Sequence, residues 1–370
     1  MLIPNCRKFT GYRPCEPYKK CLDCSDAFPI GKRILIINLD QLGDVLMTTA
    51  QLPAIKRIYP ESHISWITLK MALPILQNNP YLDKIYEWND ENRMILRNQR
   101  FDLALNADKN LNSSSFTLEL NAAEKRGFGL NENGVLIPLN NGAEFNYQMG
   151  LDDQLKFHDN QRTGQDILAE TFELNYQRDE YVVNLLPEEI EFCNAMRNRY
   201  EISDNDAVIG FNTGCSAQQP FKKMTLEQHV ELIKRLLDYS PRVKVLLLGG
   251  KAETERNQEI NRRVGNRAIE TPTTEGLRRG LLYINLCDSV VSGDTSGLHM
   301  AIALKKWIIA WFGNSAQAEI DLYNRGVKIL VESESSQKWN MGTPDPNLRQ
   351  RLDLNSVYAH ILDFVKQKLA

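Results

Sequence analysis

The sequence predicts an α/β protein made of two successive parallel sheets. Three observations lead to this expectation. Continuous apolar runs of strand length recur along the chain, and such runs are typical of strands covered on both faces. Segments with helical periodicity separate these runs. The alternation then starts again at residue 207, so the 370-residue chain, which is long enough for two domains, is expected to contain two Rossmann-like halves.

The first half begins at Lys32 and follows strand–helix–strand order. We expect strands at 34–37, 64–69, 84–86 and 101–105, and helices through 45–55 and 74–78. This order predicts parallel strands joined by right-handed crossovers. Residues 106–165 are polar and rich in Asn and Ser, so irregular loops are expected there. A helix at 165–174 and an extended stretch at 181–183 lead to a hinge.

The second half repeats the pattern without repeating the sequence. We expect its strands at 207–211, 243–248, near 268, at 290–291 and at 307–312, and its helices at 188–200, 226–237, 253–263, 276–285, 298–304 and 354–369. The resulting organisation is a cysteine-rich segment (1–30), a first domain (31–186), a second domain (187–350) and a C-terminal helix (351–370) expected to pack back on the first domain.

Composition narrows the class of protein. Hydrophobic residues make up 42% of the chain and charged residues 25%, which is typical of a globular protein. A net charge of −3 gives no indication of nucleic-acid binding. No apolar run approaches the roughly 20 residues that cross a membrane, and the N-terminus lacks the apolar core of a signal peptide. We therefore expect a cytoplasmic protein, with peripheral contact with the inner membrane left open.

Four of the seven cysteines lie within the first 24 residues, at Cys6, Cys15, Cys21 and Cys24. Disulfides are disfavoured in a reducing cytoplasm, so clustered thiols that end in a C-x2-C pair predict a metal site. Four thiolates suit tetrahedral zinc or a single iron, and an iron–sulfur cluster is a further alternative. The site is expected to be structural, because the segment does not show the open coordination position with an adjacent acid/base group that a catalytic zinc requires. The alternative is four thiols in an unstructured tail.

A strand–turn–helix pattern at 290–304 is the most informative segment for function. Small residues after Val290-Val291 allow backbone N–H groups to approach a ligand, and the N-terminus of the following helix favours phosphate. Asp294 at this turn can accept hydrogen bonds from sugar hydroxyls. The alternative is that Asp294 or Thr295 only caps the helix.

The turn GDTSGLH, from Gly293 to His299, resembles the signature of glycosyltransferase family 9, the heptosyltransferases of lipopolysaccharide assembly. Ser296 stands where the family usually has Gly, and Gly297 follows one place later. Three further segments resemble family motifs in the family's order: NLDQLGDVL (38–46), FNTGCS with FKKMT (211–225), and GGKAE (249–253). In the second of these, Met-Thr replaces the usual Trp-Pro.

The resemblance implies a GT-B fold, in which two Rossmann-like domains face a central cleft. It implies an acceptor domain followed by a nucleotide-sugar domain, and inverting transfer of heptose from a nucleotide-diphosphate donor, expected to be ADP-heptose, to a lipopolysaccharide core or other surface glycan. Catalysis then needs no metal or other cofactor.

The resemblance also assigns roles to residues. Asp44 would be the base that takes the acceptor proton, with Asp40 as a nearby rival and helix capping as the alternative. Lys222 would pair with the donor diphosphate, with Lys223 as the rival assignment and a solvated lysine pair as the alternative.

Glu253 would contact the donor ribose, or would only favour the first turn of a helix. His299 would contact the diphosphate or brace its loop. The remaining expected donor-binding residues are Thr213, Asp294, Thr295, Ser296 and Gly297.

Other functions stay open at this point. The same fold could use another nucleotide sugar or a protein acceptor, or the chain could bind nucleotide sugars without catalysis. The joint presence of Asp44, Lys222, Glu253 and Asp294 argues against the last of these. A nicotinamide dehydrogenase is disfavoured, because the first strand–helix turn reads LDQLGD and lacks the G-x-G-x-x-G fingerprint.

Overall fold

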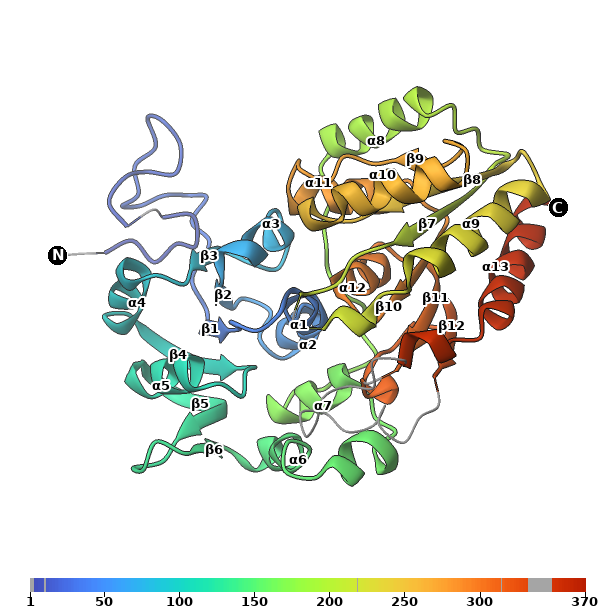
Figure 1. Cartoon of the computed structure of the whole chain (residues 1–370). Helices are drawn as coiled ribbons and strands as arrows, with labels where there is room; N and C mark the ends of the chain where they lie inside the picture. Colours follow the sequence, from blue (N-terminus) through green and yellow to red (C-terminus); the bar gives the residue numbers. More distant parts are fainter. Residues whose placement is uncertain (1–2, 10, 218, 314, 332–347) are drawn as a thin grey trace. The chain divides into compact units, whose positions relative to one another are not determined.

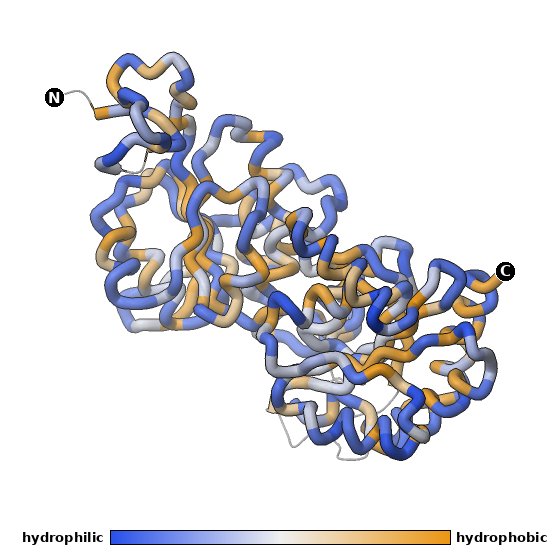
Figure 2. Tube along the Cα trace, turned by 90° about the horizontal axis from the view of Figure 1, so that it is seen from above, coloured by the Kyte–Doolittle hydropathy of each residue, from blue (hydrophilic) through white to orange (hydrophobic). Residues whose placement is uncertain are grey.

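The computed structural model describes residues 3–9, 11–217, 219–313, 315–331 and 348–370. The chain forms two compact units, each built around its own six-stranded sheet (Figure 1). Unit 1 comprises residues 1–40, 48–148 and 165–179, and unit 2 comprises residues 41–47, 149–164 and 180–370. Figure 2 shows hydrophobic stretches alternating with hydrophilic ones along the chain of both units. The two predicted sheets are therefore confirmed.

The sheet of unit 1 has the strand order β3-β2-β1-β4-β5-β6. Its strands are β1 (Arg33–Ile37), β2 (His63–Thr68), β3 (Lys84–Glu87), β4 (Arg100–Asn106), β5 (Asn121–Leu130) and β6 (Leu136–Pro138). All neighbours are parallel except β5 and β6. Residues 34–37 are completely buried, as a central strand covered on both faces requires.

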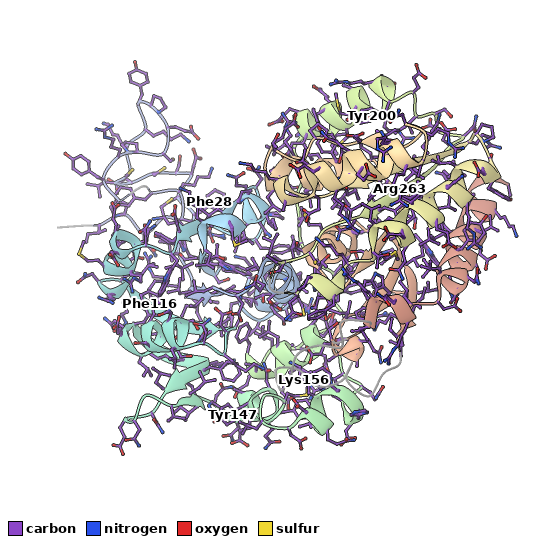
Figure 3. The ribbon with its side chains drawn as sticks, in the orientation of Figure 1. Phe28, Phe116, Tyr147, Lys156, Tyr200 and Arg263 are labelled. Atoms are coloured by element: carbon purple, nitrogen blue, oxygen red, sulfur yellow. The ribbon has the colours of Figure 1, made fainter. Side chains whose placement is uncertain are left out.

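The prediction of irregular loops over 106–165 was wrong for much of that range. It contains α5 (Leu111–Glu119), β5, β6, α6 (Glu144–Gln148) and the single turns at Asn141–Ala143 and Leu155–Asp159. The sequence of α5 looks polar, yet Ser113 and Thr117 are buried, because the Thr117 hydroxyl donates to the Ser113 carbonyl oxygen at 2.8 Å. Phe116, labelled in Figure 3, packs edge-on against Trp88 at 5.3 Å between ring centroids.

The helix expected through 45–55 is two helices, α1 (Leu42–Thr48) and α2 (Gln51–Ile58). Pro53 stands in the first turn of α2, where its missing N–H costs nothing, but it could not continue a helix from α1. The other helices of unit 1 are α3 (Leu73–Leu76), α4 (Asp90–Arg97) and α7 (Gly164–Thr171), with a single turn at Lys70–Ala72.

The sheet of unit 2 has the strand order β12-β11-β10-β7-β8-β9, with all neighbours parallel. Its strands are β7 (Ala207–Asn212), β8 (Val243–Leu248), β9 (Ile269–Glu270), β10 (Ser289–Gly293), β11 (Trp307–Phe312) and β12 (Gly326–Leu330). Residues 181–183, expected to be extended, are not assigned to a strand of either sheet.

Helices cover this sheet in two groups. In one group, α9 (Leu226–Tyr239) contacts both α10 (Thr254–Arg263) and α13 (Leu354–Leu369). In the other, α11 (Leu277–Asn285) contacts α8 (Pro187–Arg199) and α12 (Ser296–Ala303). Single turns lie at Pro220–Lys222, Lys251–Glu253, Gln317–Glu319 and Leu348–Arg351.

Two predictions about the domains differ from the structure. The C-terminal helix α13 packs on α9, β7, β11 and β12 of unit 2, and was expected on the first domain. Val357, Ile361 and Val365 form its buried stripe and join the core of the second sheet. Residues 41–47 and 149–164, expected in the first domain, belong to unit 2 by their contacts.

Candidate active site

The predicted donor motifs lie where the second sheet reverses its strand order. β7 has β8 on one side and β10 on the other. The strands that follow β7 in sequence run outward on the β8 side, and those that follow β10 run outward on the opposite side, so the order switches between β7 and β10. In open α/β sheets, ligands bind outside the carboxyl ends of strands at such a switch point. The segments after β7 and β10 are FNTGCS and GDTSGLH, and the topology therefore brings these two predicted motifs together.

The side chain of Asn212 joins the two strand ends. Its Nδ2 donates to Thr295 Oγ1 at 2.7 Å and to Ser292 Oγ at 3.0 Å. Gly297 lies directly against it, since a Cβ at residue 297 would come within 2.7 Å of the Asn212 amide. Glycine is therefore required at position 297 for α12 to begin this close to β7. Sequence analysis quoted Asn212 as part of a motif but did not single it out.

Thr295 occupies the N-cap position of α12, yet its side chain makes no capping hydrogen bond. Its hydroxyl instead accepts from Asn212. Ser296 and Gly297 are the first residues of α12. The structure therefore does not support helix capping as the role of the Thr295 side chain.

A partly buried ion pair links the second and fourth predicted motifs. Lys222 Nζ lies 2.8 Å from Asp294 Oδ2, and His299 Nε2 lies 3.8 Å from Asp294 Oδ1. Burial alone would raise the pKa of Asp294, but His299 and the Lys222 ammonium more than offset this and lower that pKa below its usual range. Asp294 is therefore ionised at neutral pH.

Tyr181 is a site residue that sequence analysis missed. Its hydroxyl lies 3.2 Å from His299 Nδ1, and the two rings stack with an interplanar angle of 9°. Tyr181 precedes α8 in an irregular stretch, so no periodicity or motif indicated it. The contact orients the imidazole, so bracing of the loop is the role of His299 that these contacts support.

The segment that carries Asp44 meets the same histidine. A Cβ at Gly43 would lie 2.6 Å from His299 Cδ2, so the imidazole packs directly on the backbone beside Asp44. Asp44 is half-buried in the first turn of α1, and its N–H donates to the Gln41 carbonyl oxygen at 2.9 Å. Unit 2 therefore brings the predicted base segment and the GDTSGLH turn together.

The third motif lies beside the end of β7. Glu253 is buried and accepts from the Gly250 N–H at 3.1 Å, while Lys223 Nζ lies 3.8 Å from its other carboxylate oxygen. A Cβ at Gly214 would meet this carboxylate at 2.6 Å. Thr213 is completely buried, and its hydroxyl contacts the Leu248 carbonyl oxygen at 2.9 Å and Asn257 Oδ1 at 2.5 Å. A role for Thr213 in donor binding would therefore fall to its backbone.

A pair of carboxyl groups lies at the switch point of the first sheet, between β1 and β4. Asp108 is completely buried and accepts from Asn38 Nδ2 at 2.5 Å and from the Leu39 N–H. Burial, together with the charge of Asp40, raises the pKa of Asp108 well above its usual value. Asp40 was considered as a rival base, but Asp108 was not identified from the sequence.

Replacing Asp40 should reduce the pH dependence of stability. Because the folded-state pKa of Asp108 is raised, its stabilising contribution is complete below pH ~3.9 and is lost as the pH rises through the folded pKa. Asp40→Asn removes one cause of this shift. Urea unfolding at about pH 5 and about pH 8 should show a smaller loss of unfolding free energy in the variant than in the parent. Glu91→Gln, at an exposed position of α4, is the control, and an unchanged loss in Asp40→Asn would contradict the assignment.

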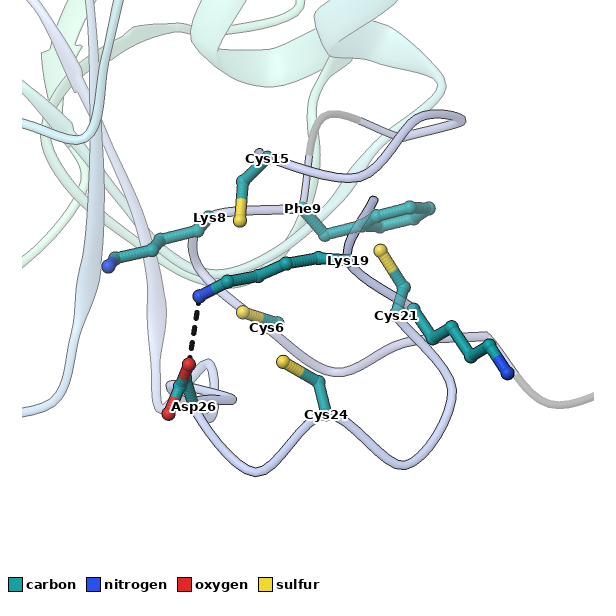
Figure 4. Close-up of a pocket in the computed structure, with 9 residues that line it drawn as sticks. Cys6, Lys8, Phe9, Cys15, Lys19, Cys21, Cys24 and Asp26 are labelled. Carbon is teal, nitrogen blue, oxygen red and sulfur yellow. Dashed lines mark hydrogen bonds and ion pairs between the residues drawn. The ribbon is translucent and has the colours of Figure 1, made fainter. Parts of the chain in front are cut away.

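The four N-terminal cysteines lie around one small cavity of about 20 Å³, together with Lys19 and Asp26 (Figure 4). The Phe28 N–H donates to Cys6 Sγ at 3.5 Å, and Lys19 Nζ pairs with Asp26 at 2.8 Å. As the side chains stand in the described parts of the chain, no group of three or more His, Cys, Asp or Glu residues is arranged to hold a metal ion. The metal site stays a prediction.

The family model for glycosyltransferase family 9 (heptosyltransferase) matches residues 93–348, more than half of the chain. The chain belongs to this family. It is therefore a glycosyltransferase, and the two parallel-sheet units are those of the GT-B heptosyltransferases.

Individual family members are distant in sequence. The chain is 22% identical to lipopolysaccharide heptosyltransferase 1 of Campylobacter coli over 302 residues, which cover 76% of this chain and 84% of that protein. The family 9 glycosyltransferase of Veillonella parvula shares the fold with a TM-score of 0.72 at 18% identity, covering 91% and 98% of the two chains. The ADP-heptose lipopolysaccharide heptosyltransferase II of E. coli gives 0.66 at 18% identity, covering 91% and 100%.

No helix in the described ranges is long and apolar enough to cross a membrane.

Proposed function

We propose that this glycosyltransferase transfers heptose with inversion from ADP-heptose to a hydroxyl of a lipopolysaccharide core or other surface glycan. The observation that carries the proposal is the convergence of Lys222, Asp294 and His299 at the switch point of the second sheet, with the segment of Asp44 packed on His299. The relatives named above as lipopolysaccharide and ADP-heptose heptosyltransferases support this donor and acceptor class.

The proposed reaction uses the chain's own residues. The carboxylate of Asp44 takes the proton of the acceptor hydroxyl, whose oxygen attacks the anomeric carbon of the donor. The bond from that carbon to the diphosphate breaks, and ADP leaves with the bonding electrons. Asp294 accepts hydrogen bonds from the sugar hydroxyls, Glu253 binds the ribose, and cationic side chains stabilise the departing diphosphate without a metal.

Calorimetry tests the donor class. Purified protein and its Asp294→Ala variant are titrated with ADP-heptose, ADP, UDP-glucose and GDP-mannose. We expect the parent to bind only the two ADP compounds, and the variant to lose ADP-heptose. A preference for UDP or GDP would replace the sugar donor but keep the enzyme, whereas binding of none of the four would contradict the proposal.

We also propose that Cys6, Cys15, Cys21 and Cys24 hold one structural zinc or iron ion. The lining of one cavity by all four thiols supports this, since four sulfur ligands fit the tetrahedral preference of either metal. Bound metal would cross-link a segment whose described residues, 3–9 and 11–30, form no helix or strand. The cytoplasmic location and the peripheral membrane contact stay predictions.

Elemental analysis tests the metal site. We expect about one equivalent of zinc or iron per chain, and loss of that metal in the Cys21→Ser/Cys24→Ser variant. Cys193→Ser, in unit 2, should retain the metal and serves as the control. Parent protein that contains neither metal would contradict the proposal.

A further inference from the structure

Two arginines from other elements lie against the loop between β7 and α9, which contains Lys222 and Lys223. Arg349 Nη1 lies 3.4 Å from the carbonyl oxygen of Pro220, and Arg256 Nη2 donates to the carbonyl oxygen of Met224 at 2.7 Å. Arg349 comes from the turn Leu348–Arg351 and Arg256 from α10. Both guanidinium groups therefore hold the loop that contains Lys222 and Lys223.

Both lysines of this loop already have carboxylate partners. Lys222 pairs with Asp294 at 2.8 Å, and Lys223 lies 3.8 Å from Glu253. Among the described residues, neither Arg256 nor Arg349 forms an ion pair with a carboxylate. Within the part of the chain that the structure describes, the two arginines are therefore the cations beside the donor loop that have no carboxylate within ion-pair distance.

Arg256 is mostly removed from solvent. Its Nε is buried and has no hydrogen-bond partner within the described parts of the chain. Burial and the nearby charge of Arg349 lower the pKa of Arg256, and the carboxylates of Glu253 and Glu227 offset this only in part. The neighbouring imidazole of His229 is neutral, because burial lowers its pKa to about 3, so it does not balance the charge of Arg256. Buried charges are normally paired, so this arrangement fits an anionic ligand.

We propose that Arg256 and Arg349 bind the diphosphate of the nucleotide-sugar donor and supply much of the charge recognition that sequence analysis assigned to Lys222. This inference rests on the proposed function. Guanidinium groups suit the task, because their planar N–H donors match phosphate oxygens and their charge persists when buried. Lys222 then serves chiefly to keep the sugar-binding carboxylate of Asp294 ionised and in place.

Calorimetry with three ligands tests the pair. ADP, adenosine and inorganic pyrophosphate are titrated into the parent, Arg256→Met and Arg349→Met. Each variant should lose roughly 10- to 100-fold in affinity for ADP and pyrophosphate, because a charge-assisted hydrogen bond is lost. Affinity for adenosine should be unchanged. Arg262→Met is the matched control, since Arg262 lies on the same helix, α10, and pairs with Glu259 at the surface.

Each result has a distinct meaning. Variants that bind ADP as the parent does would overturn the inference but leave the proposed function intact. An equal loss of ADP and adenosine would show that the arginines only support the loop, and would also overturn it. If the parent binds no ADP, the proposed function fails. Pyrophosphate then decides the inference, which holds only if the parent binds it and both variants do not. Should Arg256→Met fail to fold, Arg349→Met, at a half-exposed position, gives the same discrimination.

Discussion

Asp44→Asn should reduce heptose transfer by about 10²- to 10⁴-fold, the usual contribution of a general base. The amide cannot accept the acceptor proton, but it has nearly the same shape as the carboxylate. Affinity for the donor should therefore be nearly unchanged, because the contacts of Lys222, Asp294 and Glu253 remain. Transfer is measured as ADP release, and donor affinity by calorimetry.

Asp40→Asn is the comparison for this experiment, because Asp40 precedes the same helix. If Asp40→Asn abolishes transfer and Asp44→Asn does not, the base is Asp40. Near-normal transfer in both variants would remove this segment from proton transfer altogether. The unfolding midpoint of each variant is compared with the parent, so that loss of folding is not mistaken for loss of catalysis.

Lys222→Met should destabilise unit 2 by about 2–3 kcal/mol, because it leaves the carboxylate of Asp294 buried without its cation. The two side chains are 20% and 14% exposed, so the loss should fall at or below the lower end of the range for a buried pair. The pKa of Asp294 is lowered in the folded state, so the contribution of this pair is present above pH ~3.9 and is lost as the pH falls through the folded pKa.

A double-mutant cycle isolates the pair. Asp294→Asn added to Lys222→Met removes the unpaired charge, so the double variant should be more stable than Lys222→Met alone. Urea unfolding at neutral pH measures all four proteins. Additive losses would contradict the ion pair. All variants that lack Asp294 or Lys222 should bind ADP-heptose more weakly, whatever their stability.

Many of the strands and helices were predictable, because local patterns of apolar residues indicate them. The runs 34–37 and 207–211 read as central strands, since every side chain of such a strand meets apolar neighbours. The helix 354–369 was predicted with its observed bounds, because its apolar stripe and Asp353 cap are both local signals. β5 was missed because its exposed charged residues follow no strand period, and only residues 127–129 are fully buried.

Some residues of the candidate site were likewise predictable from the sequence, and others were not. Motifs of five to nine consecutive residues contain Asp44, Lys222, Glu253, Asp294 and His299, so their resemblance to a family was visible in the sequence. Tyr181, Asp108, Arg256 and Arg349 lie outside those motifs. Each acts through a partner far away along the chain, such as the Tyr181 hydroxyl on His299, 118 residues later.

The sequence by itself determined the fold class, the two sheets, the family and the order of the donor motifs, because these depend on local periodicity and on short runs of residues. Only the tertiary structure decided which charges are neutralised. Lys222 and Lys223 are adjacent and chemically identical in the sequence. Folding pairs Lys222 with Asp294 and places Lys223 beside Glu253. Folding also places two arginines, which form no ion pair with a carboxylate of the described residues, against the loop that contains both lysines. Electrostatic roles depend on distances across the fold, which no local pattern records.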